Sequence, residues 1–324
     1  MKINTLYRPI YLYLLALTAL VVSCDDFFEE NIQEQGVQVI SPIDGFSSPL
    51  QSITFWWESL AGATSYNIQI VSQSFNNVHK VWADTIVYGT QLILVLSPGE
   101  YQWRIRGFNS AYSTSYQTFS FSIEYNTNLE NQEMVLKTPE DNIFTNSNSI
   151  LFSWFELAAA EKYIFSIRDS EGNALVAPIE TEECELLFPD DFDLGDLPDG
   201  VYTWSVQAKN WFSETTVASR SFTLDRISPS MPVLLLPANE DTLSMGNVTF
   251  SWEQQSESIA PLYDSLFVQS SDGNVSIKLR VNSLVETIEL EAGEYEWRVQ
   301  SYDFAGNSSQ SSATRNFWIE TISK

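Results

Sequence analysis

The sequence predicts an all-β protein made of three tandem antiparallel β-sandwiches that follow a secretory signal. Two observations carry this prediction. A set of sequence landmarks recurs three times in the same order, which indicates a repeated structural unit. Between the landmarks, apolar and polar residues alternate with a period of two, as in strands with one buried face, and helical patterns are nearly absent.

The landmarks are short and strongly patterned. The first is an apolar strand that ends in tryptophan, and its copies begin at positions 53, 150 and 248, so they lie 97 and then 98 residues apart. The second has the form Gly-x-Tyr-x-Trp, at 99–103, 200–204 and 293–297, with an Asn or Asp six residues after the Trp. The third is an apolar strand that begins with Phe121, Phe222 or Phe317.

The strand phase assigns most tryptophans to the core. Residues two apart on a strand share one face, so the tryptophans of the first two landmarks point inward with the other large apolar residues. These six are Trp57, Trp103, Trp154, Trp204, Trp252 and Trp297.

The three units resemble fibronectin type III domains, over 38–124 (module 1), 135–225 (module 2) and 233–324 (module 3). The resemblance implies a core Trp on the second strand and a Tyr near the start of the sixth strand that forms a corner with the preceding loop. That tyrosine falls at Tyr101, Tyr202 and Tyr295. The Trp two residues later departs from the commoner aliphatic residue, which leaves a neighbouring bacterial Ig-like family as the alternative.

Two linkers separate the modules. Residues 125–134 are polar and lack proline, which predicts a flexible connection, whereas 226–232 contains Pro229 and Pro232 and is expected to be extended and stiffer.

The N-terminus predicts the compartment. Residues 1–23 combine a cationic start with a short apolar stretch, the pattern of a signal peptide. The end of this stretch resembles the lipobox of bacterial lipoproteins, which implies cleavage before Cys24 and acylation of its thiol. An ordinary signal peptide with a chance cysteine is the alternative.

The mature chain is expected to begin with an acidic tether, 24–37. Its acidic run resembles the surface-export signal of Bacteroidota-type lipoproteins, and it comprises Asp25, Asp26, Glu29 and Glu30. The resemblance implies an outer-membrane protein that faces outward and is held only by its lipid. A simple spacer that keeps the modules away from anionic headgroups is the alternative.

Charge and cysteine usage exclude several partners. Removal of 1–23 takes away Lys2 and Arg8 and no acid, so 14 of the 16 basic residues remain against 42 acidic ones, a formal charge of −28. Nucleic acid is a poor partner for such a chain. With Cys24 acylated, Cys184 has no partner for a disulfide, and its strand phase places it with core residues.

The residue inventory argues against an enzyme. His79 is the single histidine, so multi-histidine metal sites are excluded and a histidine-based triad could form only there. Phosphate-binding glycine motifs are absent from the sequence. We therefore expect no catalytic residue and no obligatory cofactor.

One loop is a candidate Ca²⁺ site. Residues 189–200 hold the densest acidic stretch, and Asp191, Asp193 and Asp196 supply the carboxylate oxygens that Ca²⁺ prefers. The spacing differs from the EF-hand pattern, so a solvated acidic loop is the alternative.

Four tryptophans remain outside the core pattern. Indole rings on a surface suit sugar rings or a protein partner. These candidates are Trp56, Trp82, Trp211 and Trp318, and Trp56 and Trp82 are expected on different sheets.

We therefore expect a non-catalytic surface lipoprotein for binding or adhesion, with an extracellular glycan or protein as ligand. A structural spacer, or an accessory subunit of a cell-envelope complex, is the alternative. The sequence does not identify the ligand.

Overall fold

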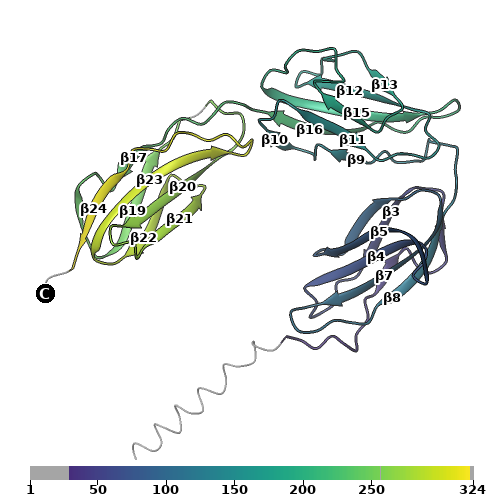
Figure 1. The fold of residues 1–324 in the computed structure, drawn as a ribbon, viewed down its shortest axis with the longest axis horizontal. Coiled ribbons are helices and arrows are strands. Elements are labelled where there is room, and N and C mark those ends of the chain that lie inside the picture. The colour runs from purple at the N-terminus through teal and green to yellow at the C-terminus, as the bar shows by residue number, and fades with distance from the viewer. Residues whose placement is uncertain (1–28, 256, 322–324) are drawn as a thin grey trace, which may run out of the picture. The chain divides into compact units, whose positions relative to one another are not determined.

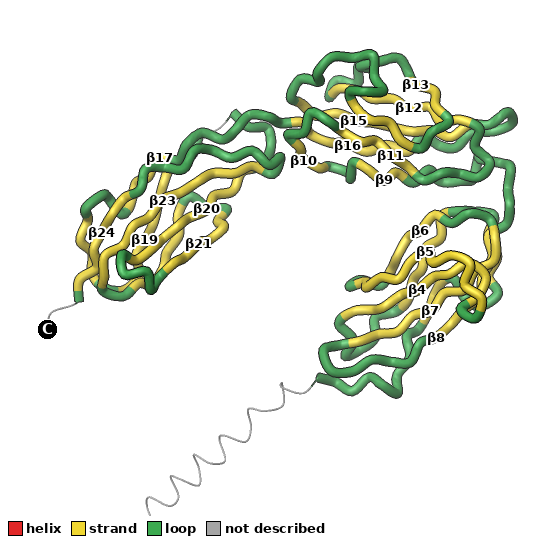
Figure 2. The backbone as a smooth tube through the Cα atoms, viewed as in Figure 1, coloured by secondary structure: helices red, strands yellow, loops and turns green. Residues whose placement is uncertain are grey.

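The structure is a computed structural model that describes residues 29–255 and 257–321. These residues form three β-sandwich modules built of strands and loops (Figures 1 and 2). Each sandwich packs a three-stranded sheet on a five-stranded sheet, which confirms the predicted fold class. Contacts divide the chain into two compact units, the first containing module 1 and the second modules 2 and 3. Cys24, Asp25 and Asp26 lie outside the described residues.

Module 1 contains strands β1 to β8. Its three-stranded sheet has the order β1-β3-β6, with β1 Val39–Ser41, β3 Ser52–Trp57 and β6 Gln91–Val95. Its five-stranded sheet has the order β2-β8-β7-β4-β5, with β2 Phe46–Ser48, β8 Gln117–Ile123, β7 Gly99–Phe108, β4 Ser65–Ser74 and β5 Asn77–Val87.

Module 2 repeats this topology with β9 to β16. Its three-stranded sheet is β14-β11-β9, with β14 Glu185–Phe188, β11 Ile150–Trp154 and β9 Leu136–Thr138. Its five-stranded sheet is β10-β16-β15-β12-β13, with β10 Ile143–Thr145, β16 Ala218–Leu224, β15 Gly200–Lys209, β12 Lys162–Asp169 and β13 Ile179–Thr181.

Module 3 repeats it again with β17 to β24. Its three-stranded sheet is β17-β19-β22, with β17 Val233–Leu236, β19 Gly246–Glu253 and β22 Val285–Leu290. Its five-stranded sheet is β18-β24-β23-β20-β21, with β18 Asp241–Ser244, β24 Arg315–Glu320, β23 Gly293–Asp303, β20 Leu262–Ser270 and β21 Ser276–Val281.

Each module has its own hydrophobic core between its two sheets. All six tryptophans predicted to face inward are buried there, which confirms the strand phase. Phe55 packs edge-on against Trp103 at 5.0 Å between ring centroids, and Phe250 packs in the same way against Trp297 at 5.2 Å. The residues that the period-two pattern placed on the inward face of the strands are therefore the ones that form the core.

The predicted tyrosine corner is present in all three modules. Each tyrosine hydroxyl donates a hydrogen bond to the backbone oxygen four residues earlier: Tyr101 to Ser97 at 2.5 Å, Tyr202 to Pro198 at 2.6 Å and Tyr295 to Glu291 at 3.1 Å. The bond fixes the loop that leads into β7, β15 or β23, and it gives the buried tyrosine hydroxyl a hydrogen-bond partner.

The segments that precede modules 1 and 2 pack onto them. Ile32 and Leu129, which lie 97 positions apart like the repeat itself, are both fully buried. Asn109 Nδ2 donates to the backbone oxygen of Glu30 at 2.9 Å, and Ser213 Oγ accepts from the backbone N–H of Leu129 at 2.9 Å. Part of the segment 24–37 and part of the segment 125–134 therefore belong to the modules that follow them.

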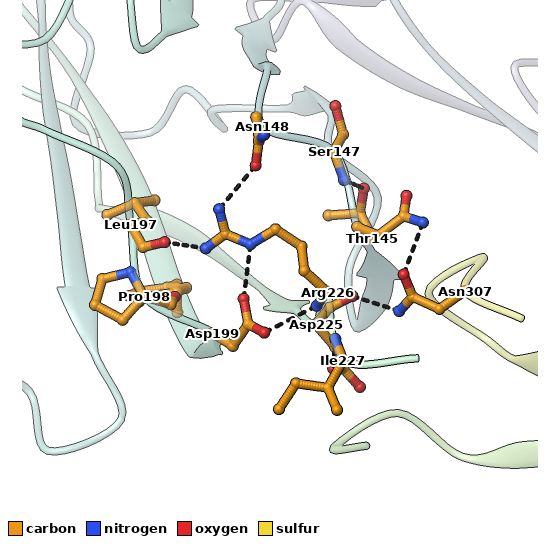
Figure 3. Close-up of polar contacts among 12 residues, drawn as sticks. Thr145, Ser147, Asn148, Leu197, Pro198, Asp199, Asp225, Arg226, Ile227 and Asn307 are labelled. Carbon is orange, nitrogen blue, oxygen red and sulfur yellow. Dashed lines mark hydrogen bonds and ion pairs between the residues drawn. The ribbon is translucent and has the colours of Figure 1, made fainter. Parts of the chain in front are cut away.

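The connection between modules 2 and 3 begins with Arg226, which is bound to module 2 (Figure 3). Its Nε lies 2.8 Å from Asp199 Oδ1, and its Nη1 donates to Asn148 Oδ1 at 2.7 Å. Its Nη2 donates to the backbone oxygen of Leu197. The guanidinium thus ties three loop residues of module 2 to the start of the linker.

Asp225, one residue earlier, is bound to module 3. Its Oδ2 accepts from the backbone N–H of Ala260 at 2.7 Å and from Ser258 Oγ at 2.7 Å, and its side chain is fully buried. Asn307 adds a hydrogen bond from Nδ2 to the backbone oxygen of Asp225 (Figure 3). The start of the linker is therefore held to module 2 by Arg226 and to module 3 by Asp225.

Among the described residues no helix is long and apolar enough to cross a membrane.

Candidate functional site

The described part of the acidic run contacts module 1. Glu29 Oε1 accepts from Ser110 Oγ at 2.8 Å, and the backbone oxygen of Glu30 accepts from Asn109 Nδ2. Both glutamates are exposed.

The three candidate Ca²⁺ ligands of the acidic loop of module 2, Asp191, Asp193 and Asp196, do not form a cluster. Asp191 Oδ2 accepts from the backbone N–H of Leu187 at 2.6 Å, so this carboxylate closes a turn. Phe192 and Leu197 of the same loop are buried in the core, whereas Asp193 and Asp196 are exposed. Among the described residues, no three His, Cys, Asp or Glu side chains are placed to hold a metal ion together.

The two tryptophan candidates of module 1 lie on different sheets, as predicted. Trp56 is on β3 of the three-stranded sheet and is 47% exposed. Trp82 is on β5 of the five-stranded sheet, half-buried, with its ring edge-on to Tyr101 at 6.0 Å between centroids. Lys80 Nζ lies 3.6 Å from the centre of the Trp82 ring. Trp82 is therefore covered by its own module, and Trp56 offers the freer indole surface.

The other two candidates belong to modules 2 and 3. Trp211 is 84% exposed and its neighbour Phe212 is 90% exposed, in the loop between β15 and β16. Asn210 holds this loop, because its Oδ1 accepts from the backbone N–H groups of Phe212 and Ser213 at 3.0 and 2.9 Å. Trp318 lies on β24 and is partly exposed, outside the core as its phase predicted.

His79 and Cys184 belong to different modules. His79 is exposed on β5. Cys184 packs against the core of module 2, and burial raises the pKa of its thiol, which disfavours the reactive thiolate.

A site that the sequence interpretation missed lies on the outer face of the five-stranded sheet of module 1. A hollow of about 630 Å³ opens there over strands β4, β5 and β7 and the loop after β7. This volume lies within the range of pockets that hold small organic ligands. Its lining is Gln33, Asn67, Gln69, Asp84, Ile86, Arg106, Phe108, Asn109, Ser110, Ala111, Tyr112, Ser113 and Tyr116.

The strand register builds the floor of this hollow. Asn67 pairs with Arg106 and with Ile86, and Gln69 pairs with Arg104 and with Asp84, so two rows of side chains cross neighbouring strands. The intervening residues, such as Ile68, face the core. The period of two therefore places all the polar groups on the solvent side.

These polar side chains form a continuous chain of hydrogen bonds. Arg104 Nε donates to Gln69 Oε1 at 2.7 Å, and Gln69 Nε2 donates to Asp84 Oδ2 at 2.9 Å. Asn67 Nδ2 donates to Asp84 Oδ1 at 3.2 Å, and the Tyr116 hydroxyl donates to Asn67 Oδ1. Each side chain orients the next, so the donors and acceptors of the floor are held in place.

Tyr116 also packs against two guanidinium groups. Its ring centre lies 4.3 Å from Arg104 Cζ and 4.6 Å from Arg106 Cζ. In the part of the chain that the structure describes, neither arginine forms an ion pair with a carboxylate, and the buried Nε of Arg106 has no hydrogen-bond partner. Fixed amide, carboxylate, guanidinium and phenol groups beside an aromatic ring can bind a polyhydroxylated ligand.

The wall of the hollow is a loop fixed by the Asn of the second landmark. Asn109 Oδ1 accepts from the backbone N–H groups of Ala111 at 3.1 Å and Tyr112 at 2.8 Å, and its Nδ2 donates to Gly62 O at 2.8 Å. An Asn or Asp recurs at this position of the repeat, and in module 1 its side chain ties two loops together.

The sequence carried a signal for this site that went unused. Asn67 and Gln69, and likewise Arg104 and Arg106, occupy alternate positions whose neighbours are core residues. Two long polar residues in outward phase on each of two strands mark a polar sheet face. Their pairing with each other depends on register, which the sequence pattern alone does not give.

Comparison with known proteins gives fold similarity only. No protein-family model and no curated protein matches the chain.

Similar solved structures include the FN1–FN3 domains of chicken CNTN1, at 13% identity and a TM-score of 0.41, covering 87% of this chain and 96% of that one. The fibronectin(III)-like modules of Clostridium thermocellum CbhA match at 10% identity and a TM-score of 0.40, covering 59% of this chain and 97% of that one. Three N-terminal domains of the bacteriophage RB49 outer capsid protein Hoc match at 10% identity and a TM-score of 0.33, covering 89% of this chain and 99% of that one. By its sheet topology, the chain consists of three tandem fibronectin type III-like β-sandwich domains.

Proposed function

We propose that this chain is a non-catalytic cell-surface lipoprotein that binds an extracellular glycan through the hollow on module 1. The observation that carries the proposal is the ordered polar floor of the hollow, in which a chain of hydrogen bonds runs from Gln69 to Tyr116. Sugar hydroxyls pair with fixed amide and carboxylate groups, and the apolar face of a sugar ring packs on a phenol or an indole.

The surface location rests on sequence patterns. A signal peptide over 1–23, a lipid on Cys24 and a Bacteroidota-type acidic export run after it together give an outer-membrane protein that faces outward. Several acyl chains would hold it firmly, because each buried CH₂ contributes about 0.8 kcal/mol. The exposed rings of Trp56 and of Trp211 are secondary candidates for ligand contact.

A spacer or accessory role is the second candidate, and the linker between modules 2 and 3 favours it. Hydrogen bonds from Arg226 and Asp225 hold this linker to both of its modules. A spacer needs a connection that keeps one module in place against the next, and the anchoring of the start of this linker to both modules provides one. In this role the chain would bind a partner protein and no glycan.

A glycan array tests the first candidate. We expect the purified protein to bind a defined set of oligosaccharides and Tyr116→Ala to lose at least tenfold in affinity for them. Tyr88→Ala is the matched control, because Tyr88 is 83% exposed and does not line the hollow. Absence of glycan binding, or equal loss in both variants, would contradict the proposed site.

Proteolysis of intact cells tests the location, with a periplasmic protein as the integrity control. We expect the native protein to be digested and a variant with Asp25→Ala and Asp26→Ala to be protected. These two acids are chosen because Glu29 contacts Ser110 of module 1 and its loss would also disturb packing. Protection of both proteins would place the chain in the periplasm and favour the spacer role.

A further inference from the structure

The outer face of the five-stranded sheet of module 3 carries a second feature with its own chemistry. Three cations and three aromatic rings alternate over strands β20, β21 and β23 and form what we name the cation–aromatic strip. Its residues are Tyr263, Phe267, Lys278, Arg280, Arg298 and Tyr302.

The strand register brings the strip together. Phe267 pairs with Lys278 on β21 and with Arg298 on β23, so a cation lies on each side of one ring. Arg298 Cζ lies 4.1 Å from the ring centre of Phe267, and Lys278 Nζ lies 5.3 Å from it. Arg280 lies two residues after Lys278 on β21, so it is on the same face of the sheet in the adjacent row of side chains.

Arg280 is held by rings in the same way. Its Cζ lies 3.7 Å from the ring centre of Tyr263, and the Tyr263 ring stacks on Tyr302 at 5.4 Å between centroids. Tyr302 is oriented in turn by a hydrogen bond to Gln300 Oε1 at 2.9 Å. Stacking covers one face of a guanidinium and restricts its motion while its N–H edges stay available.

The cations of the strip are unpaired although the chain is strongly acidic. All three ion pairs among the described residues use cations of module 2 or its linker, namely Lys162, Lys209 and Arg226. Lys278 and Arg280 are exposed, and within the described residues neither side chain makes a hydrogen bond or an ion pair. Arg298 makes one hydrogen bond, to Ser311 Oγ at 3.1 Å.

We propose that the cation–aromatic strip of module 3 binds a saccharide that bears a carboxylate, such as a uronic acid residue. The planar carboxylate matches the fork of N–H donors on Arg280 or Arg298, and the half-buried rings beside them accept the apolar face of a neighbouring sugar. A formal charge of −28 on the mature chain disfavours a densely charged polyanion, which selects a ligand with few acidic groups.

This site is separate from the hollow on module 1, and one residue position relates the two. Arg104 and Arg298 each follow a core tryptophan directly, whereas module 2 has Ser205 there. Module 1 surrounds its arginine with amides and a carboxylate, and module 3 surrounds its arginine with further cations and rings. The inference therefore adds a second site and a defined ligand charge to the proposed function.

Calorimetric titration of the purified protein with tri-galacturonic acid and with its methyl ester tests the inference without any variant. We expect the free acid to bind at least tenfold more tightly than the ester, and the affinity to fall as salt is raised from 20 to 300 mM, as a charge-assisted contact requires. Equal affinity for the acid and the ester would overturn the inference. So would binding of a tri-glutamate peptide as tight as that of the acid trisaccharide.

Variants then locate the site. Arg280→Gln together with Arg298→Gln should lower the affinity for the acid trisaccharide at least tenfold, whereas Lys162→Gln, which removes one cation from module 2, should not change it. Circular dichroism would verify that the double variant is folded, and Arg280→Gln alone, at an exposed position, serves if it is not. Retained affinity in a folded variant would refute the site, and Tyr116→Ala reports on the module 1 hollow independently.

Discussion

Asn307 of module 3 donates a hydrogen bond from its Nδ2 to the backbone oxygen of Asp225, the last residue of module 2, at 2.7 Å. Asn307 Oδ1 also accepts from Asn146 Nδ2 of module 2 at 3.0 Å. Because Asp225 itself accepts from Ala260 and Ser258 of module 3, the two modules share one buried polar network. Such a network is stabilising only while every member keeps its partner.

Asp225→Ala should therefore destabilise the chain. The substitution leaves the buried N–H of Ala260 without its acceptor, and an unpaired buried donor costs about 1–3 kcal/mol. Urea unfolding is the measurement, with Asp196→Ala as the control because Asp196 is exposed. A change of less than about 0.5 kcal/mol in Asp225→Ala would show that the network does not stabilise the linker.

The same carboxylate predicts a pH dependence. Burial would raise the pKa of Asp225, but the hydrogen bonds from Ala260, Ser258 and Ile227 lower it below its ordinary value of 3.8. A lowered pKa means that the ionised form stabilises the fold, fully above the ordinary value, and that this stabilisation is lost as pH falls through the folded pKa. The stability difference between wild type and Asp225→Asn should therefore be constant from pH 7 to 5 and shrink below about pH 4.

The repeat made the fold and most of the core predictable. The tryptophan phase placed Trp57 and Trp103 in one core and Trp56 outside it, because a sandwich buries alternate residues of each strand. The linkers were harder to interpret. Ile32 and Leu129 are isolated apolar residues in polar segments, and their burial depends on loops that arrive from distant parts of the sequence.

The candidate sites were less predictable than the fold. The sequence around Trp82 suggested an aromatic ring on the surface. In the structure, however, the ring packs against Tyr101 and Lys80 lies over it. Arg104 and Arg106 draw no attention in sequence, since a polar residue in outward phase is the expected pattern. Their significance comes from the strand pairing that sets Asn67, Gln69 and Asp84 beside them.

The two candidate tryptophans of module 1, Trp56 and Trp82, should differ in their effect on stability. Trp82→Ala removes a ring that packs on Tyr101 and the core, and we expect a loss of about 2 kcal/mol in the free energy of unfolding. Trp56→Ala removes a half-exposed ring and should cost less than about 1 kcal/mol. Thermal unfolding of both variants measures this, and equal losses would contradict the different packing of the two rings.

The contribution of the Tyr101 hydroxyl to the stability of module 1 can be measured by itself. Tyr101→Phe keeps the ring and removes the hydrogen bond to Ser97, so we expect a loss of about 1 kcal/mol in stability. Tyr88→Phe is the control, because Tyr88 is 83% exposed. Burial also raises the pKa of Tyr101 to about 12, so an alkaline absorbance titration of Tyr101→Phe should show one fewer of the phenols that ionise only at high pH. Equal stability of the two variants would mean that the corner bond is dispensable.

The pKa of Asp264 is shifted in the opposite direction to that of Asp225, so the predicted pH dependence of stability is also opposite. It occupies the position where modules 1 and 2 have Tyr66 and Tyr163, and its buried carboxylate accepts from Trp252 Nε1 at 2.6 Å and Gln254 Nε2 at 2.9 Å. Burial raises the pKa of Asp264, and the hydrogen bond from Trp252 offsets only part of that effect.

A raised pKa means that the folded state prefers the protonated acid. The stabilisation from that proton is fully present below the ordinary value of 3.8 and is lost as pH rises through the folded pKa. Relative to Asp264→Asn, wild-type module 3 should therefore gain stability as the pH is lowered from 7 to 4, over the range in which Asp225 gives no change. Hydrogen exchange of peptides from β19 and β20 at pH 7 and pH 4.5, corrected for the intrinsic rate, measures the difference between the two proteins. Loss of protection in the wild type relative to the variant on acidification would contradict the prediction, because it would mean that the charged carboxylate is the form that stabilises the core.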